Sequence, residues 1–170
     1  MKIIKPPNSI ESSSGFSVFL AGSIEMGIAE NWQDKVQKAL VDIKGVIFNP
    51  RRDDWNPLWA QNKMNPYFYE QVTWELNALE ASNLIAMYFD PATKSPISLL
   101  ELGMFAKSGK MIVCCSGKFW RKGNVDIVCE KFQVKQVDTL DKLISDIIIA
   151  SSFHKEFTEL ENERLLWAGA

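Results

Sequence analysis

Apolar segments of three to six residues alternate along the chain with longer segments in which apolar residues recur every three or four positions. The short segments are bounded by glycine, proline or polar residues, which is typical of buried strands. They predict strands at residues 16–21, 46–48, 84–89, 111–115 and 132–137, the last alternating in polarity as an edge strand does. The helical spacing predicts helices at residues 29–43, 65–81, 97–107, 138–149 and 151–167.

This alternation predicts one α/β domain with a mostly parallel five-stranded sheet and helices on both of its faces. We assign that domain to residues 16–150. Residues 1–15, with two prolines and four serines, are predicted to form a flexible N-terminal lead-in, and residues 151–170 a C-terminal helix outside the sheet. Apolar residues make up 46% of the 170-residue chain, which is enough for one sizeable core.

Charge and composition narrow the classes of partner. The chain has 19 basic and 21 acidic residues and a net charge of −2, so it lacks the positive surface that a nucleic-acid polymer requires. A small polar or nucleoside-sized ligand fits this balance better. The lead-in has no apolar signal region, and the apolar segments are shorter than a membrane span, so we expect a cytoplasmic protein without membrane contact.

The cysteines and the histidine predict neither a disulfide framework nor a metal site. Cys114, Cys115 and Cys129 are odd in number and lack paired spacing, so we interpret them as reduced thiols in the core. A structural zinc ion needs several His or Cys ligands, and His154 is the single histidine of the chain.

Ligands of parallel α/β sheets bind beyond the carboxyl ends of the strands, so the loops that follow strands are the informative ones. Glu101 lies early in the predicted helix after the 84–89 strand, among apolar neighbours. Glu75 lies on the helix before the same strand. Paired carboxylates of this kind carry out glycosidic cleavage. A helix-terminal charge for Glu101 and a solvated helix face for Glu75 remain the alternatives.

Two further loops carry candidate ligand contacts. The turn Gly22-Ser23-Ile24 follows the first strand and precedes a helix, which permits close backbone approach to a ligand, although a plain tight turn explains it equally. It has neither the Gly-Lys-Ser/Thr ending of a P-loop nor the three spaced glycines of a dinucleotide fingerprint. The loop with Trp55 and Trp59 offers aromatic rings for stacking on a base, or for covering the core or a subunit interface.

Together these segments resemble the nucleoside 2-deoxyribosyltransferase family over about residues 16–137. The resemblance rests on the order and spacing of four segments: Ala21-Gly22-Ser23-Ile24, Asn49-Pro50-Arg51-Arg52, Glu75-Leu76-Asn77-Ala78-Leu79 leading to Asn83, and Ser95 six positions before Glu101-Leu102-Gly103. It implies a three-layer, flavodoxin-like or Rossmann-like fold, a homo-oligomer, and an enzyme that uses no metal or cofactor.

The resemblance also implies roles for individual residues. Glu101 is expected to attack C1′ of a deoxynucleoside and to form a deoxyribosyl intermediate, which another base or water then releases. Glu75 is expected beside the base, and Asn124 is expected to reach a neighbouring subunit's site. The expected substrate contacts are Gly22, Ser23, Ile24, Asn49, Arg51, Trp55, Tyr67, Ser95, Ser98 and Asn124, and the partners are a nucleoside or nucleotide and a free nucleobase.

Three positions depart from the transferase pattern. Glu75 replaces an aspartate, and Ser95 replaces an aspartate where the related deoxynucleoside 5′-monophosphate N-glycosidases carry a phosphate-binding serine. Glu25, however, stands where those enzymes have an arginine, and a carboxylate would repel a phosphate by about 1 kcal/mol or more. We therefore expect an unphosphorylated substrate, with Arg51, Arg52 or Arg121 as alternative sources of positive charge.

Three other functions stay open at this stage. The first is hydrolysis, in which water rather than a second base accepts the sugar and the chain is an N-glycosidase. The second is a nucleotide-binding sensor or interaction module that keeps the fold without catalysis. A flavin-binding protein is the least favoured, because Glu25 does not suit a phosphate loop.

Overall fold

The computed structural model describes residues 1–10, 15–24 and 29–168, with the side chains of 161–168 excepted. Glu25, on which the expectation of an unphosphorylated substrate depends, lies outside these residues. The strands form one parallel six-stranded sheet in the order β1-β3-β2-β4-β5-β6. They are β1 (Lys2–Ile4), β2 (Ser17–Gly22), β3 (Val46–Phe48), β4 (Leu84–Phe89), β5 (Met111–Cys115) and β6 (Lys135–Val137).

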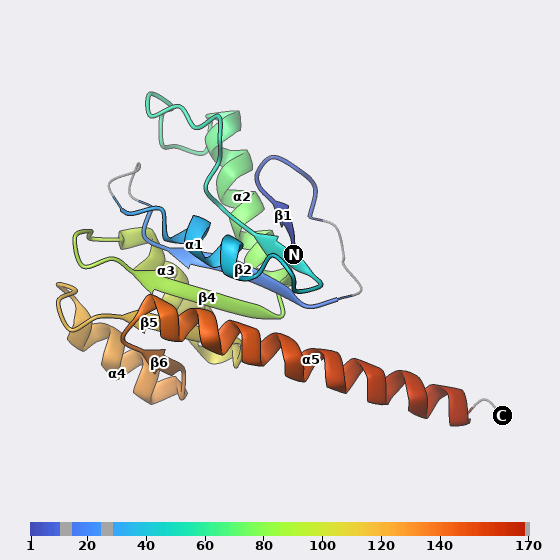
Figure 1. The fold of residues 1–170 in the computed structure, drawn as a ribbon. Coiled ribbons are helices and arrows are strands. Elements are labelled where there is room, and N and C mark those ends of the chain that lie inside the picture. The colour runs from blue at the N-terminus through green and yellow to red at the C-terminus, as the bar shows by residue number, and fades with distance from the viewer. Residues whose placement is uncertain (11–14, 25–28, 169–170) are drawn as a thin grey trace.

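The predicted α/β class is confirmed, as a three-layer, Rossmann-like arrangement (Figure 1). The sheet has one strand more than predicted, because β1 forms within the expected flexible lead-in. Its backbone pairs with β3, and Ile4 is buried in the core, so this edge position gains both hydrogen bonds and apolar burial. The strand contains only two apolar residues, Ile3 and Ile4, between Lys2 and Lys5, so it lacks the apolar run that marks the predicted strands.

The helices are α1 (Trp32–Ala39), α2 (Pro66–Ala81), α3 (Pro96–Phe105), α4 (Lys122–Phe132) and α5 (Leu140–Ala168), with a short 3-10 helix at Ala106–Ser108. The helix predicted at residues 65–81 is α2, and Asn65 caps its start by accepting hydrogen bonds from the backbone of Tyr67 and Phe68. Two predicted helices at the C-terminal end form the single helix α5, which extends beyond the sheet (Figure 1). No helix is predicted where α4 forms, and Asn124 lies in it.

Two apolar cores lie on the two faces of the sheet. One contains Trp74 and Leu79 of α2, Leu102 of α3 and Val125 of α4. The other contains Trp32 and Val36 of α1 and Leu143 and Ile147 of α5. All three cysteines are buried and form no disulfide, as interpreted from the sequence.

The order of the strands places a switch point between β2 and β4. From β2 the chain crosses to β3 on one side, and it later returns to β4 on the other, so the connections that leave β2 and β4 diverge and leave space at their carboxyl ends. Gly22 closes β2 with φ +133, opposite Tyr88 of β4. A Cβ atom there would overlap the backbone of Tyr88, so this close approach requires glycine.

We predict that Gly22→Ala lowers the free energy of unfolding by about 2 kcal/mol or more, because it combines a disfavoured φ with a backbone clash. Gly103→Ala is the matched control, since no atom lies within 4 Å of the added methyl group and the residue is helical. The control is expected to stabilise the protein by about 0.5–1 kcal/mol. Urea unfolding of both variants measures the difference, and equal stabilities would contradict this account.

Candidate active site

Glu101 lies in α3, and the start of that helix fixes its direction. Ser95 precedes the helix in a left-handed conformation, φ 47 and ψ 52, and Pro96 occupies the first helical position, where its missing N–H is harmless. The buried positions of the helix are Ser98, Glu101 and Leu102, three and four residues apart. Glu101 therefore lies on the face that packs toward the sheet, and it is 8% exposed.

Glu75 reaches the same region from α2. Its Oε1 accepts a hydrogen bond of 2.7 Å from Nε2 of Gln71, one helical turn earlier. The same nitrogen donates to the carbonyl oxygen of Pro50 at 2.9 Å. Gln71 is 5% exposed, so this side chain ties Glu75 to the segment that follows β3.

Both carboxyl groups resist ionisation. Burial, together with the charge of Glu75, raises the pKa of Glu101 from 4.5 to about 8. Burial also raises the pKa of Glu75 to about 7, although the hydrogen bond from Gln71 opposes this increase. The two groups therefore titrate as an interacting pair near neutral pH, which is typical of carboxyl groups in functional sites.

Three buried hydroxyl groups join the loops after β2 and β4. The Oγ atoms of Ser23 and Ser95 are 2.5 Å apart, and Thr93 Oγ1 lies 2.9 Å from the first and 2.7 Å from the second. The backbone N–H of Asp90 also donates to Ser23 Oγ at 2.9 Å. This hydroxyl cluster of Ser23, Thr93 and Ser95 holds the start of α3 against the Gly22 turn, and Ser95 is engaged within it.

The Gly22 turn is also held from the other face of the sheet. The indole Nε1 of Trp32 donates to the carbonyl oxygen of Ser23 at 3.0 Å, and Trp32 is completely buried. The carboxylate of Asp90 accepts hydrogen bonds from the backbone N–H groups of Ala92 and Glu30. Ile24 is half-buried beside this turn.

The candidate substrate contacts in the loop after β3 differ in their burial and in their partners. Asn49 is 2% exposed, and its side chain accepts a hydrogen bond from the backbone N–H of Arg51. Arg52 is paired with Asp54 and Glu70, at 2.6 and 2.9 Å. Arg51 makes no such pair, although its Nε and Nη2 atoms are buried.

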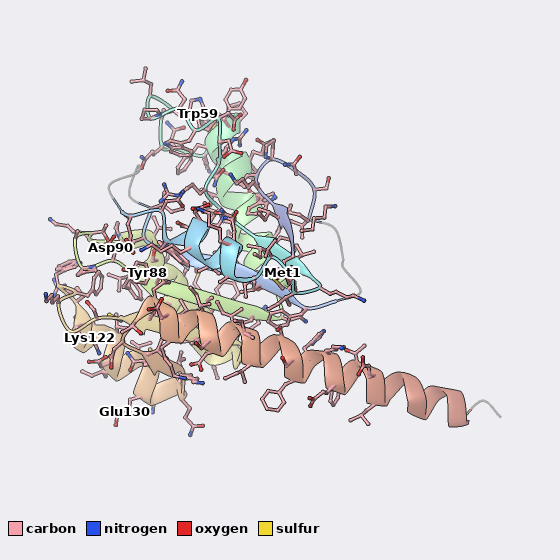
Figure 2. All side chains as sticks on the ribbon, viewed as in Figure 1. Met1, Trp59, Tyr88, Asp90, Lys122 and Glu130 are labelled. Atoms are coloured by element: carbon pink, nitrogen blue, oxygen red, sulfur yellow. The ribbon has the colours of Figure 1, made fainter. Side chains whose placement is uncertain are left out.

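The aromatic residues of this region pack on one another. Trp59 stacks on Tyr67, with ring centroids 5.0 Å apart and planes inclined by 11°, and Trp55 meets Trp59 edge to face at 5.2 Å. Figure 2 shows Trp59 beside the first turns of α2, whereas Asp90 lies at the end of β4. The rings thus cover the outer part of the loop, and stacking on a base stays a prediction for Trp55 and Tyr67.

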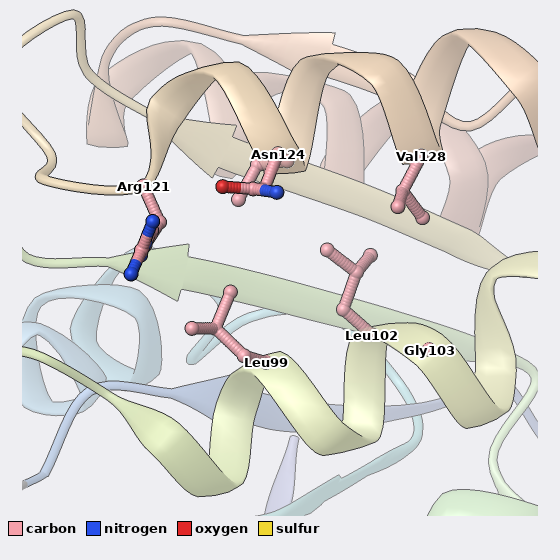
Figure 3. A pocket seen from close by; sticks show the side chains of 7 residues that line it. Leu99, Leu102, Gly103, Arg121, Asn124 and Val128 are labelled. Carbon is pink, nitrogen blue, oxygen red and sulfur yellow. The ribbon is translucent and has the colours of Figure 1, made fainter.

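Asn124 lies in a different hollow. A pocket of about 310 Å³ between α3 and α4 is lined by Leu99, Leu102, Gly103, Arg121, Asn124, Val125 and Val128 (Figure 3). Neither Glu75 nor Glu101 is among these lining residues. The structure therefore groups Glu101, Glu75, Ser23, Ser95 and Ser98 at the carboxyl edge of the sheet, and it places Asn124 in the pocket between α3 and α4.

Two contributors to this site are not apparent from the sequence. Gln71 has no distinctive neighbours, and only its position four residues before Glu75 on a helix could have indicated the contact. Thr93 lies in a loop without a motif, and its hydroxyl meets Ser23 only because β2 and β4 are neighbours.

Within residues 1–10, 15–24 and 29–168, no group of three or more His, Cys, Asp or Glu side chains could hold a metal ion. In the same part of the chain, no helix combines the length and the apolar character needed to cross a bilayer.

Comparison with known proteins adds a family and a fold. The sequence matches the family described as "Nucleoside 2-deoxyribosyltransferase like" over residues 15–119, which include both carboxyl groups and the hydroxyl cluster. A solved structure described as "conserved protein from Enterococcus faecalis V583" matches with a TM-score of 0.55 and 10% identity, covering 81% of this chain and 99% of its own. At that identity, the likeness concerns the fold alone. None of the curated proteins matches the sequence significantly.

The raised pKa values predict that stability falls as pH rises. A carboxyl group whose folded pKa exceeds its unfolded value binds more protons in the folded state, so the free energy of unfolding decreases between about pH 4.5 and pH 8. We predict that Glu101→Gln removes much of this decrease and is more stable than the native protein at pH 8 by about 3 kcal/mol. Urea unfolding at pH 5 and pH 8 measures the effect, and parallel pH profiles would reject it.

Proposed function

Because the chain belongs to the nucleoside 2-deoxyribosyltransferase-like family, we propose that it cleaves the N-glycosidic bond of deoxynucleosides through a deoxyribosyl intermediate on Glu101 and passes the sugar to another base. The observation that carries this proposal is the pair of buried carboxyl groups on α3 and α2, close enough for the charge of one to raise the pKa of the other. Such a pair matches the requirement of glycosidic cleavage for one nucleophile and one proton donor.

The proposed reaction has two displacements. The ionised carboxylate of Glu101 attacks C1′, the bond between C1′ and the base nitrogen breaks, and its electron pair leaves with the base. Glu75, in its protonated form, donates a proton to the leaving base. An acceptor base then attacks C1′ through a ring nitrogen, the ester bond to Glu101 breaks, and the nitrogen loses a proton to Glu75.

Burial of the two groups assists both steps. In a site that excludes water, the negative charge of Glu101 stabilises the oxocarbenium-like transition state more strongly than it would in solvent. Because the groups repel one another's ionisation, removal of one proton from the pair leaves a single shared charge. That charge lies more on Glu75, whose pKa is the lower of the two. The first displacement requires it on Glu101, so the remaining proton must first move from Glu101 to Glu75.

The positions of the two carboxyl groups depend on different supports. The hydroxyl cluster fixes the start of α3 and thereby the height of Glu101 above the sheet. Gln71 fixes the rotamer of Glu75 by donating to it and to Pro50. We also propose that the chain acts as a homo-oligomer, in which Asn124 of α4 reaches a neighbouring subunit's site.

We predict that Glu101→Ala lowers base release from deoxynucleosides by about a thousandfold or more, because no other group can form the ester. Glu130→Ala is the control, since Glu130 is an exposed residue of α4 (Figure 2) and its loss should leave the rate unchanged. Chromatography of a deoxynucleoside panel measures free base. A rate for Glu101→Ala near that of the native protein would reject the nucleophile.

We predict that incubation of deoxyinosine with free adenine yields deoxyadenosine. This product requires that a second base capture the sugar from the intermediate, as transfer does. Release of hypoxanthine without deoxyadenosine would show that water is the acceptor, and the chain would then be an N-glycosidase. Absence of both, with nucleoside binding retained in calorimetry, would favour the non-catalytic sensor.

We predict that Glu75→Gln abolishes the basic limb of the kcat/KM profile. In the native protein the rate should fall above about pH 7, because Glu75 then loses the proton that it donates to the leaving base, whereas the amide has no such proton to lose. The maximal rate is expected to fall by about a hundredfold, because the amide cannot donate a proton as an acid does. A basic limb that persists in Glu75→Gln would contradict the role of Glu75 as the proton donor.

A further inference from the structure

Arg51 is a half-buried cation with no ion-pair partner among the residues that the structure describes. Its Nε and Nη2 atoms are shielded from solvent and have no hydrogen-bond partner in the structure. These two nitrogens form the side-on edge of the guanidinium, whose parallel N–H groups match two oxygen atoms of a carboxylate or phosphate. Burial lowers the pKa of Arg51, and no carboxylate acts against this decrease.

The other arginines described with side chains differ from Arg51 in this respect. Arg52, the next residue, is paired with Asp54 and Glu70. Arg121 lies over the ring of Trp120, 4.3 Å from its centroid, and lines the pocket between α3 and α4. An uncompensated buried charge is costly, so Arg51 is the arginine whose geometry calls for an added anion.

A second unpartnered donor lies in the same loop. The indole Nε1 of Trp55, four residues further on, is also buried without a hydrogen-bond partner. Tryptophan has no acceptor on its ring, so this N–H adds another donor beside a cation rather than a group that could neutralise it. A neutral base could satisfy the N–H groups but would leave the charge of Arg51 uncompensated, whereas an oxyanion satisfies both.

The loop that holds these donors is tied to the carboxyl pair. The carbonyl oxygen of Pro50, the residue bonded to Arg51, accepts from the side chain of Gln71, and Gln71 donates to Glu75. Residues 51–65 form neither helix nor strand, so the two donors lie on a loop that follows β3, the kind of segment that often carries binding residues. The fork of Arg51 thus belongs to the same edge of the sheet as Glu75.

From this arrangement we infer that Arg51 and Trp55 form an oxyanion subsite that binds a phosphate group of the substrate. The inference rests on the proposed function and makes the substrate a phosphorylated deoxynucleoside. It departs from the expectation, drawn from Glu25, of an unphosphorylated substrate. The fork of Arg51 accepts two phosphate oxygens, the indole of Trp55 donates to a phosphate oxygen, and the dianion neutralises the buried charge.

Binding of inorganic phosphate tests the subsite without any reaction. In thermal melts of the full chain at constant ionic strength, saturating phosphate should raise Tm by about 3 °C relative to chloride. Arg51→Gln should abolish this shift and should melt about 3 °C above the native protein without phosphate, because an uncompensated charge has been removed. Lys131→Gln, at an exposed residue of α4, is the control for the change of charge and should keep the shift.

Kinetics then test the substrate class. The native protein should prefer a deoxynucleoside 5′-monophosphate to the free deoxynucleoside by about a hundredfold in kcat/KM, which a charge-assisted bidentate contact supports. Arg51→Gln should lose this preference, because its kcat/KM on the monophosphate should fall about a hundredfold further than its kcat/KM on the free deoxynucleoside. Arg51→Lys should recover little of it, because lysine lacks the fork, and Trp55→Phe should lose it in part.

The outcomes separate the subsite from the proposed function. Equal losses on both substrates in Arg51→Gln, absence of a phosphate shift in the native protein, or a lower Tm of Arg51→Gln without phosphate would each overturn the subsite. If the protein releases base from free deoxynucleosides but phosphate does not raise its Tm, the subsite is wrong and the proposed function is retained. A phosphate shift that depends on Arg51, without base release from any substrate, would keep the subsite and reject the proposed chemistry.

Discussion

The burial of Glu75 and Glu101 beside one another is the constraint on which the rest of the site depends. A solvated carboxyl group gives up its proton below neutral pH, whereas these two hold theirs to about pH 7 and 8 because water is excluded and their charges repel. The folded chain tolerates this cost of ionisation only because sheet packing and backbone contacts fix both helices. Ionisation of these two side chains therefore lowers the stability of the fold, whereas the proposed chemistry requires one of them to ionise.

The supports of the pair explain why so many polar groups are buried at this edge of the sheet. Ser23, Thr93 and Ser95 satisfy one another, so the loops after β2 and β4 approach closely without leaving hydroxyl groups unpaired. Trp32 holds the same turn from the opposite face. The unpaired donors of Arg51 and Trp55 stand out against this background, and so does the unpaired acceptor Oε1 of Gln71.

Sequence reasoning predicted the elements better than their contacts. Periodicity located α2 and the strands β4 and β5, because burial of one face or of both leaves a pattern in the chain. It missed β1, whose two apolar residues lie between lysines and form no apolar run. It also divided α5 in two, although Ser151 and Ser152 donate to the backbone of Ile148 and do not interrupt the helix.

The sequence by itself determined the α/β class, the family and the two carboxyl groups, because these follow from residue type and from spacing along one element. Only the tertiary structure decided which groups meet across elements: Gln71 with Pro50, Ser23 with Thr93, and Arg51 with no partner. Such contacts depend on strand order and register, which bring residues about seventy positions apart to one edge of the sheet. The local sequence pattern does not predict these contacts, since each residue taken alone would also suit a solvated surface.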